Sequence, residues 1–174
     1  GDGERIEGNQ YVFTAPFTGE SANHARPLQG YDCFFNKPRW VFGNGNWVIY
    51  RHEVGGVSQL DGGIEATVGY YTGGTVIVEA SVNESDWVDV AVLAGMETVT
   101  ASLPSSLFPA EAVWVRFRAA PSSDAPDVPV GLQLYGYTYS ATLEHGPGDF
   151  HGATRFIAVP ESAGQVLITY ENLG

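Results

Sequence analysis

The amino-acid sequence predicts an all-β protein built as an antiparallel β-sandwich. The first observation is that roughly nine to eleven short segments of alternating apolar and polar residues follow one another along the chain. The second is that no convincing amphipathic helix interrupts them; a single short helical turn is expected between Pro104 and Pro109. The third is that 22 glycines and 10 prolines are spread along the 174 residues, which suits many turns.

The stretch from Thr75 to Val92 gives the clearest strand pair. Val76, Val78, Ala80 and Val82 fall on one side of an extended chain, which predicts one buried face. The polar cluster 83–86 can turn the chain, and a second alternating run begins at Trp87. We expect a β-hairpin here.

The residues before this hairpin contain further strands. Residues 1–30 are weakly patterned, with a first strand expected at 11–13, and the segment 31–54 is the richest in aromatic residues. Within it, Gly43-Asn44-Gly45-Asn46 separates two apolar runs at 40–42 and 47–50, which predicts either a second hairpin or a glycine-rich loop between two strands. Another alternating strand is expected at 64–71.

The residues after the hairpin also alternate. In the strand 112–118, Val113, Val115 and Phe117 should point inward and Trp114, Arg116 and Arg118 outward. The long strand 131–143, with a bend at Gly136, should place Gln133, Tyr135, Tyr137 and Tyr139 on one face. Two closing strands are expected at 155–159 and 165–170. With no repeat and no clear linker, residues 1–174 are predicted to form one domain.

The composition excludes some partners. A net charge of −12 with only eight basic residues disfavours nucleic acid and anionic membranes. The acidity is explained by solubility, by adaptation to salt or by cation binding. The lone Cys33 excludes an internal disulfide and indicates a buried, inert thiol. No apolar run is long enough to span a bilayer, and the first residues do not begin a signal peptide, although a leader could have been removed from a precursor.

Several segments between about Trp40 and Leu143 resemble a known family, and they include WVIYRHEV (47–54) and GGIEATVGYY (62–71), which are similar to its middle strands. VEASVNESDWVDVAV (78–92), VWVRFRA (113–119) and GLQLYGYTYSATL (131–143) look like strands of galactose-binding-like jelly-roll domains, the coagulation-factor or discoidin type that includes many bacterial carbohydrate-binding modules. The chain departs from that pattern in its turn at 83–86, its missing terminal cysteines and its last thirty residues. The resemblance implies a jelly-roll fold and a secreted or cell-surface location. It also implies a structural Ca²⁺ ion, which is common in that fold.

Carbohydrate binding needs flat aromatic faces and planar polar groups. Three places offer them: the loop at 43–46 with its flanking indoles, the outward side of the strand 112–118, and the tyrosines of the strand 131–143. Each place also has a structural alternative. The indoles could lie in the core, the arginines could pair with carboxylates, and the tyrosines could be half-buried residues of the sheet. The candidate binding residues are Trp40, Asn44, Asn46, Trp47, Trp114, Arg116, Arg118, Tyr135, Tyr137 and Tyr139.

Acidic residues in two loops suggest oxygen ligands for Ca²⁺, either Asp124 with Asp127 or Glu84 with Asp86; solvated loops are the alternative. The four histidines have no metal-ligand spacing, so no metal ligand set is assigned. No catalytic motif is present, and a glycosidase carboxylate pair cannot be selected from twenty acidic residues.

These observations favour a non-catalytic carbohydrate-binding module that attaches a larger secreted protein to a polysaccharide and requires no cofactor. The first alternative is a structural or protein-interaction domain, such as a shell, fibre or adhesion unit. The second is a small polysaccharide lyase or hydrolase. The two arginines at 116 and 118 suggest a uronic or sulfated polymer, whereas the net charge of −12 opposes one, so the polymer is left open.

Overall fold

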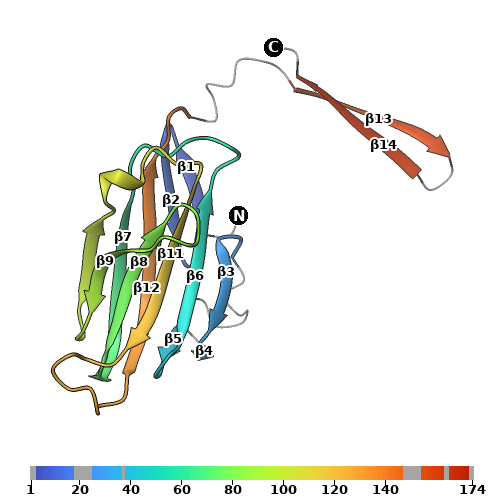
Figure 1. Ribbon diagram of the computed structural model, residues 1–174. Helices are drawn as coiled ribbons and strands as arrows, with labels where there is room; N and C mark the ends of the chain where they lie inside the picture. The colour runs from blue at the N-terminus through green and yellow to red at the C-terminus, as the bar shows by residue number, and fades with distance from the viewer. Residues whose placement is uncertain (1–2, 18–24, 37, 147–153, 163–164, 173–174) are drawn as a thin grey trace.

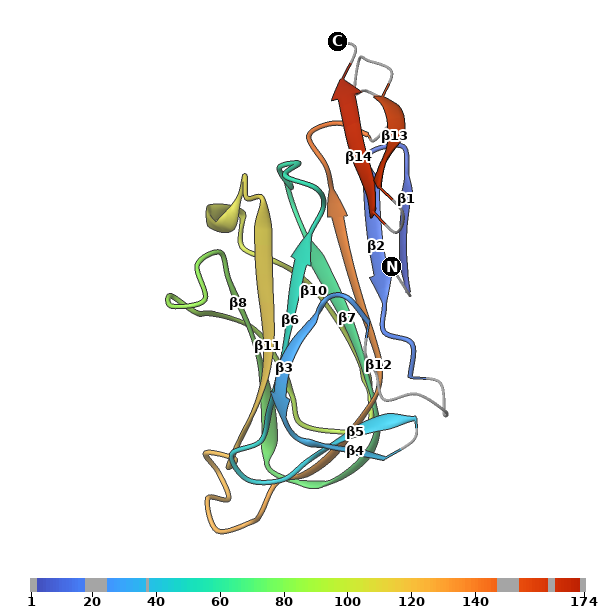
Figure 2. The same cartoon turned by 90° about the vertical axis from the view of Figure 1, so that its right-hand side faces the viewer.

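A computed structural model describes residues 3–17, 25–36, 38–146, 154–162 and 165–172, with side chains described up to residue 146. Two antiparallel sheets are stacked as a sandwich, as Figures 1 and 2 show from two sides. The fold class predicted from the sequence is therefore confirmed. In the described part, the one helical element is a 3₁₀ turn at Ser105–Leu107, within the expected segment, and no helix there is long and apolar enough to cross a membrane.

The first sheet is organised around its longest strand, β12 (Gly131–Thr142). One edge of β12 pairs along its length with β7, while the other edge pairs with β5 near its start and with β2 near its end. β10 and β4 lie outside β7 and β5, and β1 lies outside β2. The remaining members of this sheet are β1 (Glu4–Glu7), β2 (Gln10–Thr14), β4 (Phe34–Asn36), β5 (Arg39–Phe42), β7 (Gly63–Gly73) and β10 (Thr98–Ser102).

The second sheet has the order β3-β6-β11-β8-β9, and all of its neighbouring strands are antiparallel. Its central strand β11 alternates as predicted, with Val113, Val115 and Phe117 fully buried and the residues between them partly exposed. The strands are β3 (Leu28–Asp32), β6 (Trp47–Glu53), β8 (Thr75–Ser81), β9 (Val88–Leu93) and β11 (Ala112–Ala120).

The last two strands form a sheet of their own. β13 (Thr154–Ser162) and β14 (Gln165–Asn172) pair antiparallel with each other, as the sequence predicts two closing strands. That all 174 residues form one domain stays a prediction.

The predicted hairpin at 75–92 is confirmed as β8 and β9. Val76, Val78 and Ala80 are fully buried, but Val82 is exposed, because β8 ends at Ser81 and the chain leaves the sheet there. For the Gly43–Asn46 segment, the hairpin alternative is wrong. β5 belongs to the first sheet and β6 to the second, so the segment is a loop that crosses between the two layers.

The predicted tyrosine face of β12 is also wrong. Two irregularities in the pairing with β7 flank Leu134, so the side-chain alternation changes phase near Gly136. Gln133 and Tyr135 therefore lie on the outer surface, whereas Tyr137 and Tyr139 point into the core and are at most 1 % exposed.

Side chains from both sheets fill the space between them. Trp40 of the first sheet is 1 % exposed, and its Nε1–H donates to the hydroxyl of Tyr50 in the second sheet at 2.9 Å. Burying each large apolar side chain contributes about 1.5–3 kcal/mol. The core thus holds the two layers together and leaves their outer faces to carry the candidate site.

Candidate functional site

The outward side chains of β6, β11 and β8 form a surface that we call the arginine face: Trp47, Ile49, Arg51, Glu79, Trp114, Arg116 and Arg118. The strand register places these side chains in rows. Arg118 lies between Trp47 and Ile77, Arg116 between Ile49 and Glu79, and Trp114 between Arg51 and Ser81. Alternation along β11 therefore brings an indole and two guanidinium groups to one side, as the sequence predicts.

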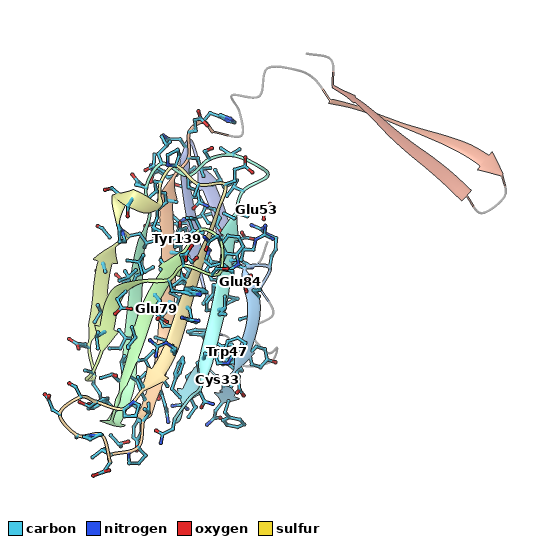
Figure 3. All side chains as sticks on the ribbon, viewed as in Figure 1. Cys33, Trp47, Glu53, Glu79, Glu84 and Tyr139 are labelled. Atoms are coloured by element: carbon cyan, nitrogen blue, oxygen red, sulfur yellow. The ribbon has the colours of Figure 1, made fainter. Side chains whose placement is uncertain are left out.

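Glu79 of β8, labelled in Figure 3, holds the two arginines of β11 in place. Its Oε2 accepts from Arg116 Nε at 2.8 Å and from Arg118 Nε at 3.0 Å, and its Oε1 accepts from Arg118 Nη2 at 3.0 Å. Burial raises the pKa of this carboxyl group, but the hydrogen bonds from Arg118 and Arg116 outweigh burial and lower it below its usual value. Glu79 is therefore ionised at neutral pH, and the guanidinium groups are fixed before any ligand arrives.

Two indoles stack on arginines of the same face. The guanidinium carbon of Arg116 lies 4.1 Å from the ring centroid of Trp87, and that of Arg51 lies 5.1 Å from Trp114. Arg51 also pairs with Glu53 at 2.6 Å. Because Arg51 lies over the Trp114 ring, Trp114 is a covered platform rather than an open one.

A pocket of about 480 Å³ opens beside Trp47, and we call it the Trp47 pocket. The indole of Trp47 is half-buried. Its ring edge packs against Gly30 of β3, where a Cβ atom would lie 3.5 Å from the ring. Because Gly30 has no side chain, the ring lies directly against the backbone. The pocket is lined by Gly45, Trp47, Ile49, Arg116, Arg118 and Ala119.

A second pocket of about 430 Å³ lies further along β6 and β11, at Trp114. Residues Trp47 and Ile49 of β6 line the first pocket, and Arg51 and Glu53 line the second. At about 3.4 Å per residue, Trp47 and Arg51 are about 14 Å apart along the strand. The two pockets therefore follow one another along the same pair of strands.

The asparagines of the 43–46 loop have structural contacts. Asn46 Oδ1 accepts from the Gly43 N–H at 2.7 Å, and Asn44 Oδ1 accepts from the Val130 N–H at 2.7 Å. Gly45 adopts a positive φ of 77°, which suits glycine at this turn. The side-chain oxygens of these two candidate residues therefore hold the loop in place.

The other candidate residues do not meet at the arginine face. Trp40, Tyr137 and Tyr139 lie in the core, where a polysaccharide cannot reach them. Tyr135 lies on the outer face of the first sheet, the opposite side of the sandwich. Of the ten residues selected from the sequence, Trp47, Arg116 and Arg118 share one pocket.

The outer face of the first sheet has an aromatic row, which we call the aromatic face: Phe34, Arg39, Val41, Tyr70, Gln133 and Tyr135. Sequence reasoning placed Gln133 and Tyr135 together on one face but missed the other members of this row. The register places Phe34, Val41, Gln133 and Tyr70 side by side across four strands. Phe34 is 66 % exposed and Tyr70 46 % exposed, and Arg39 lies 4.8 Å over the Tyr135 ring. Alternation in β7 could not reveal this row, because Ile64, Ala66 and Val68 are buried whereas Tyr70, two residues further on, is exposed, and the pairing with β12 shifts register between Val68 and Tyr70.

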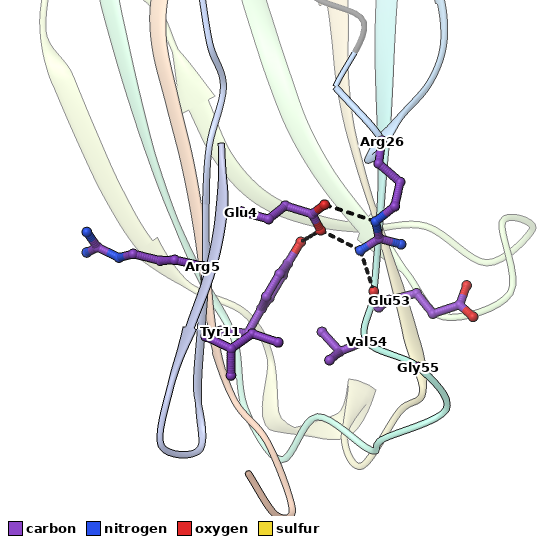
Figure 4. A pocket seen from close by; sticks show the side chains of 8 residues that line it. Glu4, Arg5, Tyr11, Arg26, Glu53, Val54 and Gly55 are labelled. Atoms are coloured by element: carbon purple, nitrogen blue, oxygen red, sulfur yellow. Dashed lines mark hydrogen bonds and ion pairs between the residues drawn. The ribbon is translucent and has the colours of Figure 1, made fainter. Parts of the chain in front are cut away.

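Sequence reasoning also missed a polar network that runs from the surface into the core. Figure 4 shows its outer part, at Glu4, Tyr11 and Arg26. Glu4 accepts from Arg26 Nε at 2.9 Å, from Arg26 Nη2, and from the Tyr11 hydroxyl at 2.8 Å. Burial raises the pKa of Glu4, but the bonds from Arg26 and Tyr11 outweigh burial and lower it to about 2. A pocket of about 350 Å³ lies beside these groups. The polar atoms of Glu4, Tyr11 and Arg26 mainly form hydrogen bonds with one another.

The network continues to His52, which is fully buried. Its Nε2 lies 2.8 Å from the Tyr137 hydroxyl and its Nδ1 3.5 Å from that of Tyr11. Since the Tyr11 hydroxyl donates its hydrogen bond to Glu4, we infer that Nδ1 bears the imidazole proton and that Nε2 accepts from Tyr137. Burial lowers the pKa of His52 to about 3 and raises that of Tyr137. Neither group is exposed to solvent, so the network fits a structural role.

Within the described residues, no group of three or more His, Cys, Asp or Glu side chains could hold a metal ion. In the turn at 83–86, Asn83 Oδ1 accepts from the backbone N–H groups of Ser85 and Asp86, and Glu84 accepts from Gln29. The expected Ca²⁺ stays a prediction from the family resemblance. Cys33 is half-buried, its Sγ donates to the Val41 carbonyl at 2.9 Å, and burial raises the thiol pKa to about 12.

No family model matches the sequence, and no curated protein matches it either.

Proposed function

We propose that this chain is a non-catalytic carbohydrate-binding module, of the galactose-binding-like jelly-roll class, within a larger secreted or cell-surface protein. It binds a polysaccharide on the arginine face, with Trp47 as the main contact. The proposal extends the resemblance of the segments 78–92, 113–119 and 131–143 to that class.

The observation that best supports this proposal is the composition of the Trp47 pocket. A half-buried indole lies beside two guanidinium groups whose positions are fixed by Glu79. An indole can cover the C–H face of a pyranose, and guanidinium N–H groups can donate to its hydroxyl or acidic oxygens. Because the side chains are already held in place, little conformational entropy is lost on binding.

The environment of the titratable groups with the largest pKa shifts supports a binding rather than a catalytic role. His52, Tyr137 and Tyr139 are enclosed between the sheets. Glu4 and Glu79, whose pKa values are lowered, are both occupied by arginines. A general acid or base must come within hydrogen-bond reach of its substrate. These groups are either enclosed in the core or already bonded to arginines, so a polymer does not reach them in that way.

The first prediction tests this proposal by affinity electrophoresis on a panel of polysaccharides, with and without EDTA. We expect at least one polymer to retard the protein, and Trp47→Ala to weaken binding about tenfold or more, because it removes the aromatic contact. Tyr70→Ala, which removes an exposed ring from the aromatic face, is the matched control and should bind like the wild type.

EDTA should leave the retardation unchanged, since the proposed contacts are side chains of the chain itself. No retardation on any polymer, or equal loss in Trp47→Ala and Tyr70→Ala, would contradict the proposal. Shortening of an added polysaccharide during the assay would instead favour the lyase or hydrolase alternative.

A second candidate function, a protein-interaction or structural domain, is favoured by the aromatic face. Phe34 and Tyr70 are strongly exposed there, in one row with Val41. Exposed apolar patches on a protein surface often mark interfaces. A defined oligomer in light scattering that dissociates in Phe34→Ser, together with no response to any glycan, would support this function over carbohydrate binding.

A further inference from the structure

The Trp47 pocket presents cations to solvent while keeping its anion underneath. The side chains of Arg116 and Arg118 are 23 % and 38 % exposed, whereas that of Glu79, which pairs with both, is 6 % exposed. A ligand that enters the pocket therefore meets guanidinium groups and not the carboxylate.

The guanidinium groups retain hydrogen-bond donors for a ligand. Glu79 accepts from Arg116 through Nε, and from Arg118 through Nε and Nη2. A guanidinium group has five N–H donors, so the Nη groups of Arg116 and the Nη1 group of Arg118 are outside these bonds. Such donors match the oxygens of a carboxylate or a sulfate.

The other charges near this pocket lie away from its lining. Asp89, which pairs with Glu79 across β8 and β9, does not line the pocket, although its negative charge acts on Arg118. Glu53 pairs with Arg51 and lines the second pocket. No acidic residue lines the Trp47 pocket itself. At physiological salt the screening length is about 8 Å, so the distant negative charges of this chain contribute little there.

We propose that the Trp47 pocket binds an acidic sugar residue, a uronic acid or a sulfated sugar, within the polysaccharide. This inference rests on the proposed carbohydrate-binding function and specifies the ligand class. The indole of Trp47 covers the sugar ring, and Arg118 with Arg116 binds the carboxylate or sulfate group.

The test compares matched acidic and uncharged polymers by affinity electrophoresis at physiological salt. Polygalacturonate is paired with fully methyl-esterified pectin, and carrageenan with agarose, so the two arms separate carboxylate from sulfate. We expect one acidic polymer to be bound at least tenfold more tightly than its uncharged counterpart. Arg118→Gln should weaken that binding about tenfold, and Arg5→Gln, with the same change of charge on an exposed residue of β1, should not.

The outcomes separate the two proposals. Equal retardation by an acidic polymer and its counterpart, or unchanged binding by Arg118→Gln, would overturn the acidic-ligand inference; the carbohydrate-binding function would then stand if Trp47→Ala still abolishes retardation. Binding of uncharged polymers alone would likewise overturn the acidic-ligand inference and leave the carbohydrate-binding function standing. No retardation by any polymer in the panel would overturn both.

Discussion

At the scale of single residues, the sandwich keeps a histidine neutral between its sheets. His52 stacks on Tyr139 with ring centroids 3.9 Å apart and planes within 4°, and its Nε2 is hydrogen-bonded to Tyr137. Gln59 links the same groups, because it accepts from the Tyr139 hydroxyl at 2.6 Å and donates to the His52 carbonyl at 3.0 Å. Charging this imidazole would place an ion in an aromatic environment that has no acid in direct contact with it.

This burial predicts a pH dependence of stability. The pKa of His52 is about 3 in the folded chain and about 6.5 when unfolded. Between these values the unfolded chain binds a proton that the folded chain does not, so stability falls as the pH drops below 6.5. From pH 7 to pH 5 the loss should be at most about 2 kcal/mol. Glu4 and Glu79 have lowered pKa values and lose their contribution only below about 4.5, outside this window.

Urea denaturation at pH 7 and pH 5 measures the effect. In His52→Gln, whose amide can still bond to Tyr137, the difference between the two pH values should largely disappear. A wild type that is equally stable at both values would show that His52 is not held neutral by burial. A pH dependence that persists in His52→Gln would assign it to other groups.

At the scale of elements, the connection between β7 and β8 takes the chain from the first sheet to the second through one residue. β7 ends at Gly73, β8 begins at Thr75, and Gly74 between them has a φ of 72°. A side chain at Gly74 would begin 2.7 Å from the Cα of Val130. Both the backbone angle and the packing therefore require glycine.

The substitution Gly74→Ala should destabilise the fold by about 2–4 kcal/mol, about 1–2 from the positive φ and the rest from overpacking. Gly56→Ala is the matched control, because Gly56 has a φ of 77° and nothing within 4 Å of the added carbon. It should cost only the 1–2 kcal/mol or so of backbone strain. Equal losses for both variants in urea denaturation would contradict the close approach of Val130.

The elements also show which parts of the candidate site the sequence could predict. Unbroken alternation in β11 was sufficient to place Trp114, Arg116 and Arg118 outward. The face of Tyr137 and Tyr139 could not be predicted, because the irregular pairing beside β7 reverses the alternation and no residue type marks it unambiguously. Trp40 was ambiguous because an indole serves equally in a core or on a surface, and only the side of β5 that faces the other sheet, which Trp40 shares with Phe42, decides.

At the scale of the whole molecule, the alternating pattern predicted the architecture because each strand has one apolar side that must be buried against another layer. It could not predict which outer face is the better candidate for ligand binding, since both faces have aromatic and arginine side chains. Three of the eight basic residues lie on the arginine face of a chain with net charge −12. This concentration arises from the pairing of β6 with β11, which joins residues more than sixty positions apart.

The most direct test of carbohydrate binding at the arginine face is an NMR titration that follows the indole N–H signals of the four tryptophans. Each signal is assigned with a single Trp→Phe variant, and the ligand is a polysaccharide fragment that retards the protein in electrophoresis. We predict that the Trp47 signal shifts with increasing ligand while the buried Trp40 signal does not. A titration in which the Trp47 signal stays fixed, with shifts confined to residues of the aromatic face, would contradict the account.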